Sequence, residues 1–230
     1  VINKEVNFIV QQDLPIEIIN RLESVVIPTL QSFFTDTDKL QNSLTESVTE
    51  VQQLKNELKQ AHELAKTDEL TNIPNRRGFN QIMEQVIAKA LHQQTSFALI
   101  ILDLDFFKTV NDTYGHLIGD STLRYVERIL ATETKGRDYI ARLGGEEFAV
   151  LLPDIDYSSA LKVANNIRLK ISSKTLQVKN YANPLKLTVS GGVAMYQMNE
   201  DMEQIIQRAD KALYHAKNHG RNRICGEESL

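Results

Sequence analysis

A pair of adjacent glycines, Gly144 and Gly145, constrains the fold of this chain more than any other feature. The pair separates two runs of strand-forming residues, and glycine adopts positive φ without a steric penalty. We therefore expect a tight hairpin with positive φ at its tip. After the turn, residues 148–152 are all apolar, which predicts a strand that enters the core.

Two acids, Glu146 and Glu147, follow the turn directly. Adjacent carboxylates repel each other unless a cation or a basic group offsets their charge. A solvated hairpin tip is the simpler interpretation of these residues taken alone. A second acidic site argues against it, because Asp103 and Asp105 stand where the apolar run 97–102 ends. We expect Asp105 to cap a turn or to pair with a basic neighbour rather than to bind metal.

The chain beyond residue 96 alternates strands and helices. Gly191-Gly192 indicates a bulge or a close backbone approach within one strand, and Gly220 is placed to end the last helix. The expected elements are a buried strand 97–102, a helix 117–130, the glycine hairpin, a helix 158–171, a strand 185–195, a helix 202–218 and a strand 223–225. This βαββαβ order predicts an α+β protein with a ferredoxin-like core.

In such a sheet the first strand and the hairpin strands are central neighbours, so Asp103 is expected close to Glu146 and Glu147. Carboxylate oxygens are the ligands that Mg²⁺ prefers, and the sequence offers no His/Cys cluster with zinc spacing. A cation held by carboxylates near basic residues indicates chemistry on nucleotide phosphates.

Residues 1–66 differ from the rest, since they lack glycine and contain only Pro15 and Pro28 as prolines. We expect a helical segment here, including residues 1–36, and a domain boundary that leaves 67–230 as the second domain. Apolar or small residues repeat every four and three positions at Leu40, Leu44, Ser47, Val51, Leu54, Leu58, Ala61 and Ala65. This heptad pattern predicts a coiled-coil linker over about 38–66. A single amphipathic helix packed on its own domain is the alternative.

The composition excludes several classes of protein. A formal net charge of −4 argues against a nucleic-acid partner. No apolar run approaches the roughly 18 residues that a membrane-spanning helix needs, so we expect no membrane segment in this chain. The single cysteine, Cys225, permits no internal disulfide and is typical of a reducing compartment, here the cytoplasm.

Taken together, the motifs resemble the GGDEF domain, the diguanylate cyclase of bacterial signalling. The signature reads Gly144-Gly145-Glu146-Glu147-Phe148, a variant compatible with activity in that family. The resemblance runs from Thr67 to about Arg223. Its other matching motifs are 67–77 (TDELTNIPNRR), 103–108 (DLDFFK), 111–112 (ND), 115–116 (GH), 119–120 (GD), 187–193 (LTVSGGV), 209–214 (ADKALY), Lys217 and 220–223 (GRNR).

The resemblance implies that two GTP molecules condense to cyclic di-GMP and release two pyrophosphates. Asp103 and Glu146 would bind two Mg²⁺ ions per active site, or Mn²⁺ in their place, with help from the Leu104 carbonyl. Glu147 would be a further ligand or the base that helps deprotonate the attacking hydroxyl. The positions that match triphosphate-binding residues of the family are Lys108, which we also count as catalytic, Lys217, Arg221 and the backbone N–H groups near Phe106 and Phe107.

Asn111 and Asp120 match the positions that bind guanine in the family. A carboxylate accepts from N1–H and the exocyclic amine of guanine, and adenine does not offer that pattern. We therefore expect GTP to be preferred over ATP.

The family's product-inhibition motif, Arg-x-x-Asp, is altered here. The matching residues are Lys135-Gly136-Arg137-Asp138, so Asp138 is retained and Lys135 replaces the arginine. Lysine lacks the planar bidentate contact that arginine makes with guanine or phosphate. We expect weak or absent product inhibition, partly rescued by Arg137 at most.

One domain supplies one GTP site, but the reaction joins two substrates. The resemblance therefore implies a C₂ homodimer, and the heptad segment would raise the local concentration of the partner domain. An upstream sensor module is a further expected partner. Two alternatives stay open: a catalytically silent module that binds GTP or cyclic di-GMP and signals through protein contacts, and a purine nucleotide cyclase acting within one substrate molecule.

Overall fold

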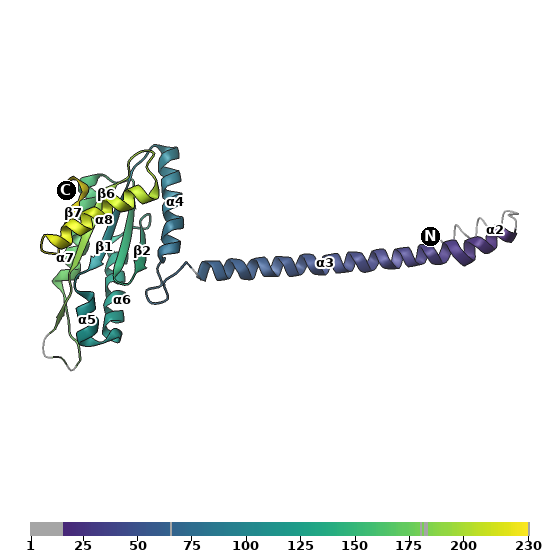
Figure 1. The fold of residues 1–230 in the computed structure, drawn as a ribbon, viewed down its shortest axis with the longest axis horizontal. Helices are drawn as coiled ribbons and strands as arrows, with labels where there is room; N and C mark the ends of the chain where they lie inside the picture. The colour runs from purple at the N-terminus through teal and green to yellow at the C-terminus, as the bar shows by residue number, and fades with distance from the viewer. Residues whose placement is uncertain (1–15, 65, 180, 182–183, 230) are drawn as a thin grey trace. The chain divides into compact units, whose positions relative to one another are not determined.

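The computed structural model describes residues 16–64, 66–179, 181 and 184–229. The chain divides into two units between Ala61 and His62. The first unit contains a short helix α2 (Ile16–Arg21), a π-helical turn η1 (Leu22–Val26) and most of the long helix α3 (Ile27–Leu64), which Figure 1 labels. None of the helices in the described residues is both long and apolar enough to cross a membrane.

Helix α3 confirms the helical prediction for the stretch after residue 26. The absence of glycine and the spacing of apolar residues suit a long helix. Four residues of the heptad pattern, Leu40, Leu44, Val51 and Leu54, are each at least 50% exposed. They form an apolar stripe that one helix alone does not bury. The pairing of two such helices stays a prediction, and residues 1–15 and Ala65 of the predicted segments lie outside the described residues.

The second unit is built on a five-stranded sheet with the order β2-β3-β1-β6-β7. Its strands are β1 (Phe97–Leu104), β2 (Tyr139–Gly144), β3 (Glu147–Pro153), β6 (Val189–Met195) and β7 (Ile224–Gly226). Its helices are α4 (Arg76–Gln93), α5 (Phe107–Tyr114), α6 (His116–Glu133), α7 (Tyr157–Ser173), α8 (Met202–Asn218) and a 3₁₀ turn η2 (Glu227–Ser229).

The strand order confirms the α+β, ferredoxin-like prediction. Strand β1 lies between β3 and β6 and is antiparallel to both, and β2 pairs with the outer side of β3. Strand β7 extends this core because it pairs parallel to β6 after the crossover through α8. All eight residues of β1 are buried, which explains the continuous apolar run that predicted it.

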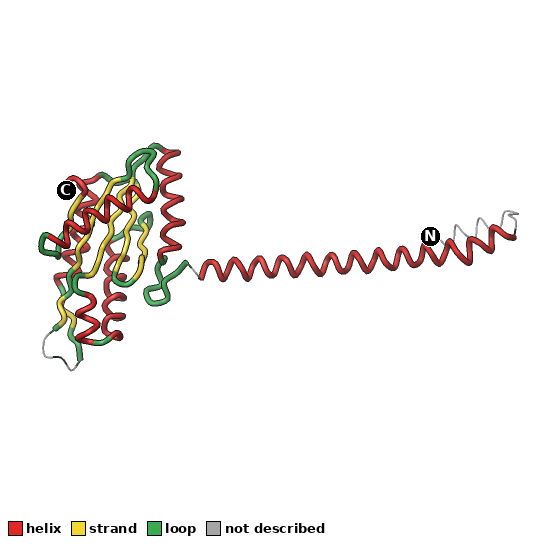
Figure 2. The backbone as a smooth tube through the Cα atoms, in the orientation of Figure 1, coloured by secondary structure: helices red, strands yellow, loops and turns green. Residues whose placement is uncertain are grey.

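Helices cover both faces of the sheet (Figure 2). Alternate residues of β1 contribute to two separate clusters: Ile100 packs with residues of α6 and α7, and Leu99 packs with residues of α4 and α8. This alternation follows from the opposite directions of successive side chains in a strand. Asp103 shares the parity of Leu99, so it belongs to the face that α8 covers.

The predicted strand 185–195 was wrong as a single element. Strand β5 (Leu185–Lys186) pairs with β4 (Thr175–Leu176) in a separate two-stranded sheet, and only β6 joins the main sheet. Leu187 and Thr188 separate the two strands, and the backbone N–H of Asp105 donates to the Thr188 carbonyl at 2.9 Å, next to the β1–β6 pairing. Within β6, Gly192 shows the predicted close approach and no bulge: the β1–β6 register is continuous, and a Cβ on Gly192 would lie 2.0 Å from the Ala209 carbonyl of α8.

Candidate active site

The glycine hairpin forms as predicted at the junction of β2 and β3. Gly144 has φ 152° and Gly145 has φ 43°, the positive values that favour glycine. Glu147 pairs with Gly144 across the turn, and the register shifts between Arg142 and Gly144. The two acids therefore stand at the open end of β3.

A brace from the segment before α4 holds this hairpin. Arg142 donates to the Gly145 carbonyl from Nε at 3.1 Å and from its second terminal nitrogen at 2.7 Å. The same guanidinium lies 3.0 Å from both carboxylate oxygens of Asp68. Burial alone would raise the pKa of Asp68, but hydrogen bonds from Thr71 and Arg142 outweigh it and lower that pKa below its usual value. The conformation of the turn thus depends on a residue far away in the sequence.

The structure brings Asp103 next to the hairpin acids. Asp103 lies directly opposite Glu147 in the β1–β3 register. The backbone N–H of Leu104 donates to the carbonyl of Glu146 at 3.3 Å. Asp103 is only 7% exposed, whereas Glu146 and Glu147 are half-buried. One buried and two accessible acids therefore meet at the end of the central strand.

Helix α8 supplies a cation to the buried acid. Lys217 Nζ lies 2.8 Å from Oδ2 of Asp103. Burial raises the pKa of Asp103, and the carboxylates of Glu147 and Asp105 add to this effect, while Lys217 opposes it. The charge of Asp103 is therefore maintained mainly by this lysine among the side chains that the structure describes.

The sequence predicts that Arg76 braces the fold or the site through ion pairs, and Asp210 was not among the predicted site residues. Arg76 donates to the Leu143 carbonyl at 3.1 Å and forms an ion pair of 3.5 Å with Glu147. Burial raises the pKa of Asp210 on α8, against the attraction of Arg76 and Lys217. Both residues lie in the motifs 67–77 and 209–214, but nothing in those motifs shows that the two are near enough to interact electrostatically.

The donor set suits a hard cation, because Asp103, Leu104, Glu146 and Glu147 offer only oxygen ligands. Within the described residues, no three acidic, histidine or cysteine side chains are gathered closely enough to hold a metal ion. Lys217 instead provides the positive charge at Asp103. The oxygen ligands of these residues thus suit Mg²⁺, and the acidic side chains would have to change conformation to bind it together.

The N-terminus of α5 lies directly after β1. Phe106 adopts φ 58° and is 63% exposed, and the Arg221 guanidinium lies 4.8 Å above its ring. Phe107 is buried, and Lys108 is exposed in the first turn of the helix. Backbone N–H groups at a helix N-terminus attract anions. With Lys108 and Arg221 nearby, this end of the molecule offers positive charge to a phosphate group.

The two predicted guanine-binding residues come from neighbouring helices. Asn111 lies on α5 and Asp120 on α6, and the helices meet at Gly115, which has φ 82°. A Cβ on Gly119 would lie 1.9 Å from Oδ1 of Asn111, so the Asn111 side chain rests directly on this glycine, one residue before Asp120. The sequence places glycine where Asn111 needs room.

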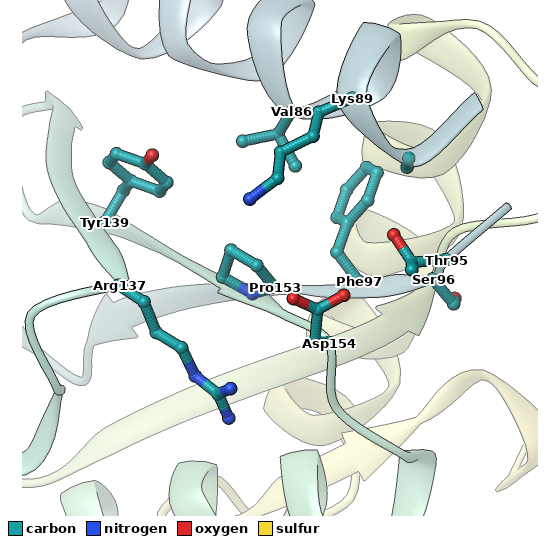
Figure 3. Close-up of a pocket in the computed structure, with 10 residues that line it drawn as sticks. Val86, Lys89, Thr95, Ser96, Phe97, Arg137, Tyr139, Pro153 and Asp154 are labelled. Atoms are coloured by element: carbon teal, nitrogen blue, oxygen red, sulfur yellow. The ribbon is translucent and has the colours of Figure 1, made fainter. Parts of the chain in front are cut away.

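The altered Arg-x-x-Asp motif lies in the turn before β2, away from the acids. Asp138 accepts from the backbone N–H of Lys135 at 2.7 Å, which closes the turn on itself. Arg137 lines a pocket of about 200 Å³ at the opposite end of the sheet, beside the start of β1 and the end of β3. Figure 3 shows Lys89 reaching over this pocket from α4, with Arg137 and Asp154 on the other side.

A buried strand-end acid, a glycine hairpin with two further acids, and lysines beside a helix N-terminus form a candidate site for phosphate groups and a hard cation. Residues 65–223 match the model of the diguanylate cyclase GGDEF domain. The chain belongs to this family.

Similar proteins support the assignment. The response regulator PleD of Caulobacter vibrioides is 37% identical over 175 residues, which are 76% of this chain and 38% of PleD. The chain therefore spans less than half the length of this relative. Among solved structures, the coiled coil and GGDEF domain of DgcB from Caulobacter crescentus, in complex with c-di-GMP, matches with a TM-score of 0.72 and 36% identity over 81% of this chain and 98% of that one. Diguanylate cyclase SiaD from Pseudomonas aeruginosa, in complex with its activator SiaC, matches with a TM-score of 0.67 and 29% identity over 97% of this chain and 87% of that one.

Proposed function

We propose that this chain is an active diguanylate cyclase, which condenses two GTP into cyclic di-GMP and releases two pyrophosphates. The observation that carries the proposal is the placement of Asp103 opposite Glu147, with Lys217 at 2.8 Å from the buried acid. A module that only binds nucleotide needs no such concentration of acids beside phosphate-binding cations. Family membership supports the same reaction.

Each residue then has a distinct role. Lys108, Lys217, Arg221 and the N–H groups at the start of α5 bind the triphosphate. Asn111 and Asp120 bind guanine. Glu147 is accessible and held loosely by Arg76 at 3.5 Å, so its carboxylate is free to accept the proton of the attacking 3′-hydroxyl.

Asp103, Glu146 and the Leu104 carbonyl would hold Mg²⁺. When bound, the metal neutralises phosphate charge and lowers the pKa of a coordinated hydroxyl. Lys217 has to leave Asp103 before it can serve the triphosphate, and α8 lets the flexible lysine stem turn without moving the helix. The resting pair Lys217–Asp103 thus keeps the buried acid charged until substrate arrives.

The reaction requires two chains, because each binds one GTP and the bonds join the two substrates. A two-fold arrangement places the 3′-hydroxyl of each GTP at the α-phosphorus of the other. The exposed stripe of α3 is suited to pair with the same stripe of a second copy. DgcB, similar to this chain over its coiled coil and GGDEF domain, supports this assignment of α3.

We infer that regulatory input enters through residues 1–36, because this segment contains none of the proposed catalytic or binding residues. SiaD matches nearly the whole of this chain and is seen with an activator protein, which favours a protein input over a small molecule. Removal of residues 1–36 leaves the α3 stripe in place and tests the inference. An unchanged rate at every enzyme concentration, with and without candidate partner proteins, contradicts it.

The decisive test is incubation of the purified chain with GTP and Mg²⁺, followed by detection of cyclic di-GMP. Formation of the product at a rate that rises with dimer concentration supports the proposal. Binding of GTP without turnover identifies a silent module, and a cyclic mononucleotide identifies the intramolecular cyclase. ATP in place of GTP should give no product, since Asp120 matches guanine. A cytoplasmic location, where GTP and a reduced Cys225 are both expected, completes the proposal.

A further inference from the structure

The carboxylate of Asp105 has no part in the reaction proposed above, although it is only 6% exposed. Thr188 Oγ1 donates to its Oδ2 at 2.8 Å, and Ser190 Oγ donates to its Oδ1 at 2.7 Å. These two partners are hydroxyl groups and not a basic neighbour, which was one of the two roles that the sequence suggested beside the capping of a turn. Asp105 therefore fastens the end of β1 to the start of β6.

A third donor comes from the far end of the chain. The backbone N–H of Asn222 lies 3.0 Å from Oδ2 of Asp105. Asn222 belongs to the loop between α8 and β7, and the residue before it is Arg221, one of the proposed triphosphate ligands. One buried carboxylate thus connects β1, β6 and the loop that carries Arg221.

This loop has a conformation that needs external support. Arg221 has φ 53° and Asn222 has φ 46°, so two successive residues without glycine's freedom occupy the left-handed region. This region is unfavourable for residues with a Cβ, more so for arginine than for asparagine. Asp105 holds the Asn222 N–H, and Arg168 donates to the Asn222 carbonyl at 3.3 Å from the other side. The turn is fixed because both of its backbone groups at Asn222 are bound.

Asp105 also precedes Phe106, the residue that starts α5. The Arg221 guanidinium lies 4.8 Å above the Phe106 ring. Asp105 fixes the position of Phe106 because the two are adjacent in the chain. It fixes the position of Arg221 through its hydrogen bond with the backbone N–H of Asn222. Both groups that flank the proposed triphosphate site therefore depend on one acid that does not itself face the site.

We propose that Asp105 is a positioning residue, which holds Arg221 and the N-terminus of α5 in the geometry that binds the triphosphate of GTP. Both of its oxygens are already used by O–H and N–H donors, which argues against a role as a metal ligand. The inference rests on the proposed function, because triphosphate binding is what this geometry serves.

Two substitutions separate positioning from charge. Asp105→Ala removes all three contacts. Asp105→Asn keeps an oxygen for Thr188 and Asn222, and its amide donates to Ser190, whose hydroxyl turns to accept. The probes are α,β-methylene GTP, which cannot be cleaved at the reacting bond, and GMP, each with Mg²⁺ in a calorimetric titration. We expect Asp105→Ala to weaken binding of the triphosphate about tenfold and of GMP less than about twofold, and Asp105→Asn to restore most of the loss.

A double variant tests whether Asp105 acts through Arg221. Arg221→Met alone should weaken triphosphate binding, and adding Asp105→Ala should weaken it little further, since coupled residues are not additive. An unchanged ratio of triphosphate to GMP affinity in Asp105→Ala overturns the inference. So does an Asp105→Asn variant as defective as Asp105→Ala, or full additivity with Arg221→Met.

Separate controls address a failure of the variant to fold and a failure of the proposed reaction. If Asp105→Ala does not fold, Thr188→Val removes one donor to Oδ2 and should lower the affinity ratio in the same direction by a smaller factor; no change overturns the inference. Wild-type chain that binds the GTP analogue but forms no cyclic di-GMP contradicts the proposed reaction alone, and the affinity ratio still decides on Asp105. Wild-type chain that binds no GTP analogue contradicts both.

Discussion

Lys217 on α8 and Asp103 at the end of β1 form an ion pair of 2.8 Å, in which the acid is buried and the lysine is about one-third exposed. The pair joins residues from the two halves of the domain sequence at the point where the hairpin acids also stand. Asp103 belongs to the proposed metal site and Lys217 to the proposed triphosphate site. Their contact therefore couples the two.

Replacing Asp103 by asparagine should abolish activity without destabilising the fold. Burial raises the pKa of Asp103, so the folded state disfavours its charged form. The acid therefore contributes stability below its unfolded pKa, and that contribution is lost as the pH rises through the folded pKa. At pH 7 we expect the free energy of unfolding of Asp103→Asn, measured in urea, to equal that of wild type or to exceed it by up to about 1 kcal/mol. Cyclic di-GMP formation should fall at least about 100-fold.

The control is Asp154→Asn, an exposed acid at the other end of the same sheet. Asp154→Asn should change neither the free energy of unfolding nor the rate of cyclic di-GMP formation. A clear loss of stability in Asp103→Asn alone would show that the acid serves the fold, and residual activity near wild type would remove it from the site.

Lys217→Met should raise the KM for GTP at least about tenfold, because a charge-assisted contact to the triphosphate is lost. Lys211→Met is the matched control on the same helix, since Lys211 is exposed and lies outside the proposed site. Initial rates over a range of GTP concentrations give the KM of both variants. Equal KM values for the two variants would show that Lys217 serves Asp103 and not the substrate.

The brace between Asp68 and Arg142 should make stability sensitive to acid. The pKa of Asp68 is lowered in the folded state, so its contribution is fully present above the unfolded pKa and is lost as the pH falls through the folded pKa. Asp68→Asn should lower the free energy of unfolding by about 1–2 kcal/mol at pH 7. The difference from wild type should shrink below pH 4.

Urea unfolding at several pH values measures this dependence, with the exposed neighbour variant Glu69→Gln as control. A difference between Asp68→Asn and wild type that stays constant down to pH 3 would contradict the ion pair as its source.

Acidic residues in the α3 stripe should make activity depend on dilution. Leu44→Glu with Leu54→Glu places like charges where two helices are proposed to meet, and specific activity should fall steeply as enzyme is diluted. Asn42→Glu with Asn56→Glu adds the same charge on the opposite side of the heptad. Activity and sedimentation velocity of both variants measure the effect, and parallel dilution curves would exclude the pairing of α3.

Lys135→Arg should create product inhibition where wild type shows little. The turn geometry already exists, because Asp138 accepts the backbone N–H of Lys135 at 2.7 Å, and arginine adds the planar fork. Calorimetry with cyclic di-GMP should show at least about tenfold tighter binding in Lys135→Arg than in wild type. Tight wild-type binding that Asp138→Ala removes would show that lysine suffices.

Local rules predicted much of the fold. The glycine pair predicted the hairpin because positive φ is a property of the residue itself. The apolar run predicted β1, and the spacing of apolar residues predicted α8 with the bounds that the structure shows. The single strand 185–195 failed because Leu185 and Lys186 pair with β4 and not with the main sheet, and no local pattern reveals which strand is the partner.

The site was predicted less completely, for the same reason. Motifs placed Asp103, Glu146 and Glu147 in one region, since the strand order follows from the order of elements. Asp210 was missed because its place near Arg76 and Lys217 depends on how α8 packs on the sheet. Helix α4 itself was not predicted at all, although Asn75 caps its N-terminus.

Gly192 has a consequence for the proposed reaction, although it lies in the middle of the sheet. A methyl group there would collide with the Ala209 carbonyl at 2.0 Å and the Leu213 backbone nitrogen at 2.4 Å, so α8 rests on bare main chain. The height of the helix above the sheet determines how far the Lys217 amine reaches toward Asp103. A substitution of this glycine would therefore displace Lys217 and change the rate of the proposed reaction, although Gly192 lies outside the proposed nucleotide site.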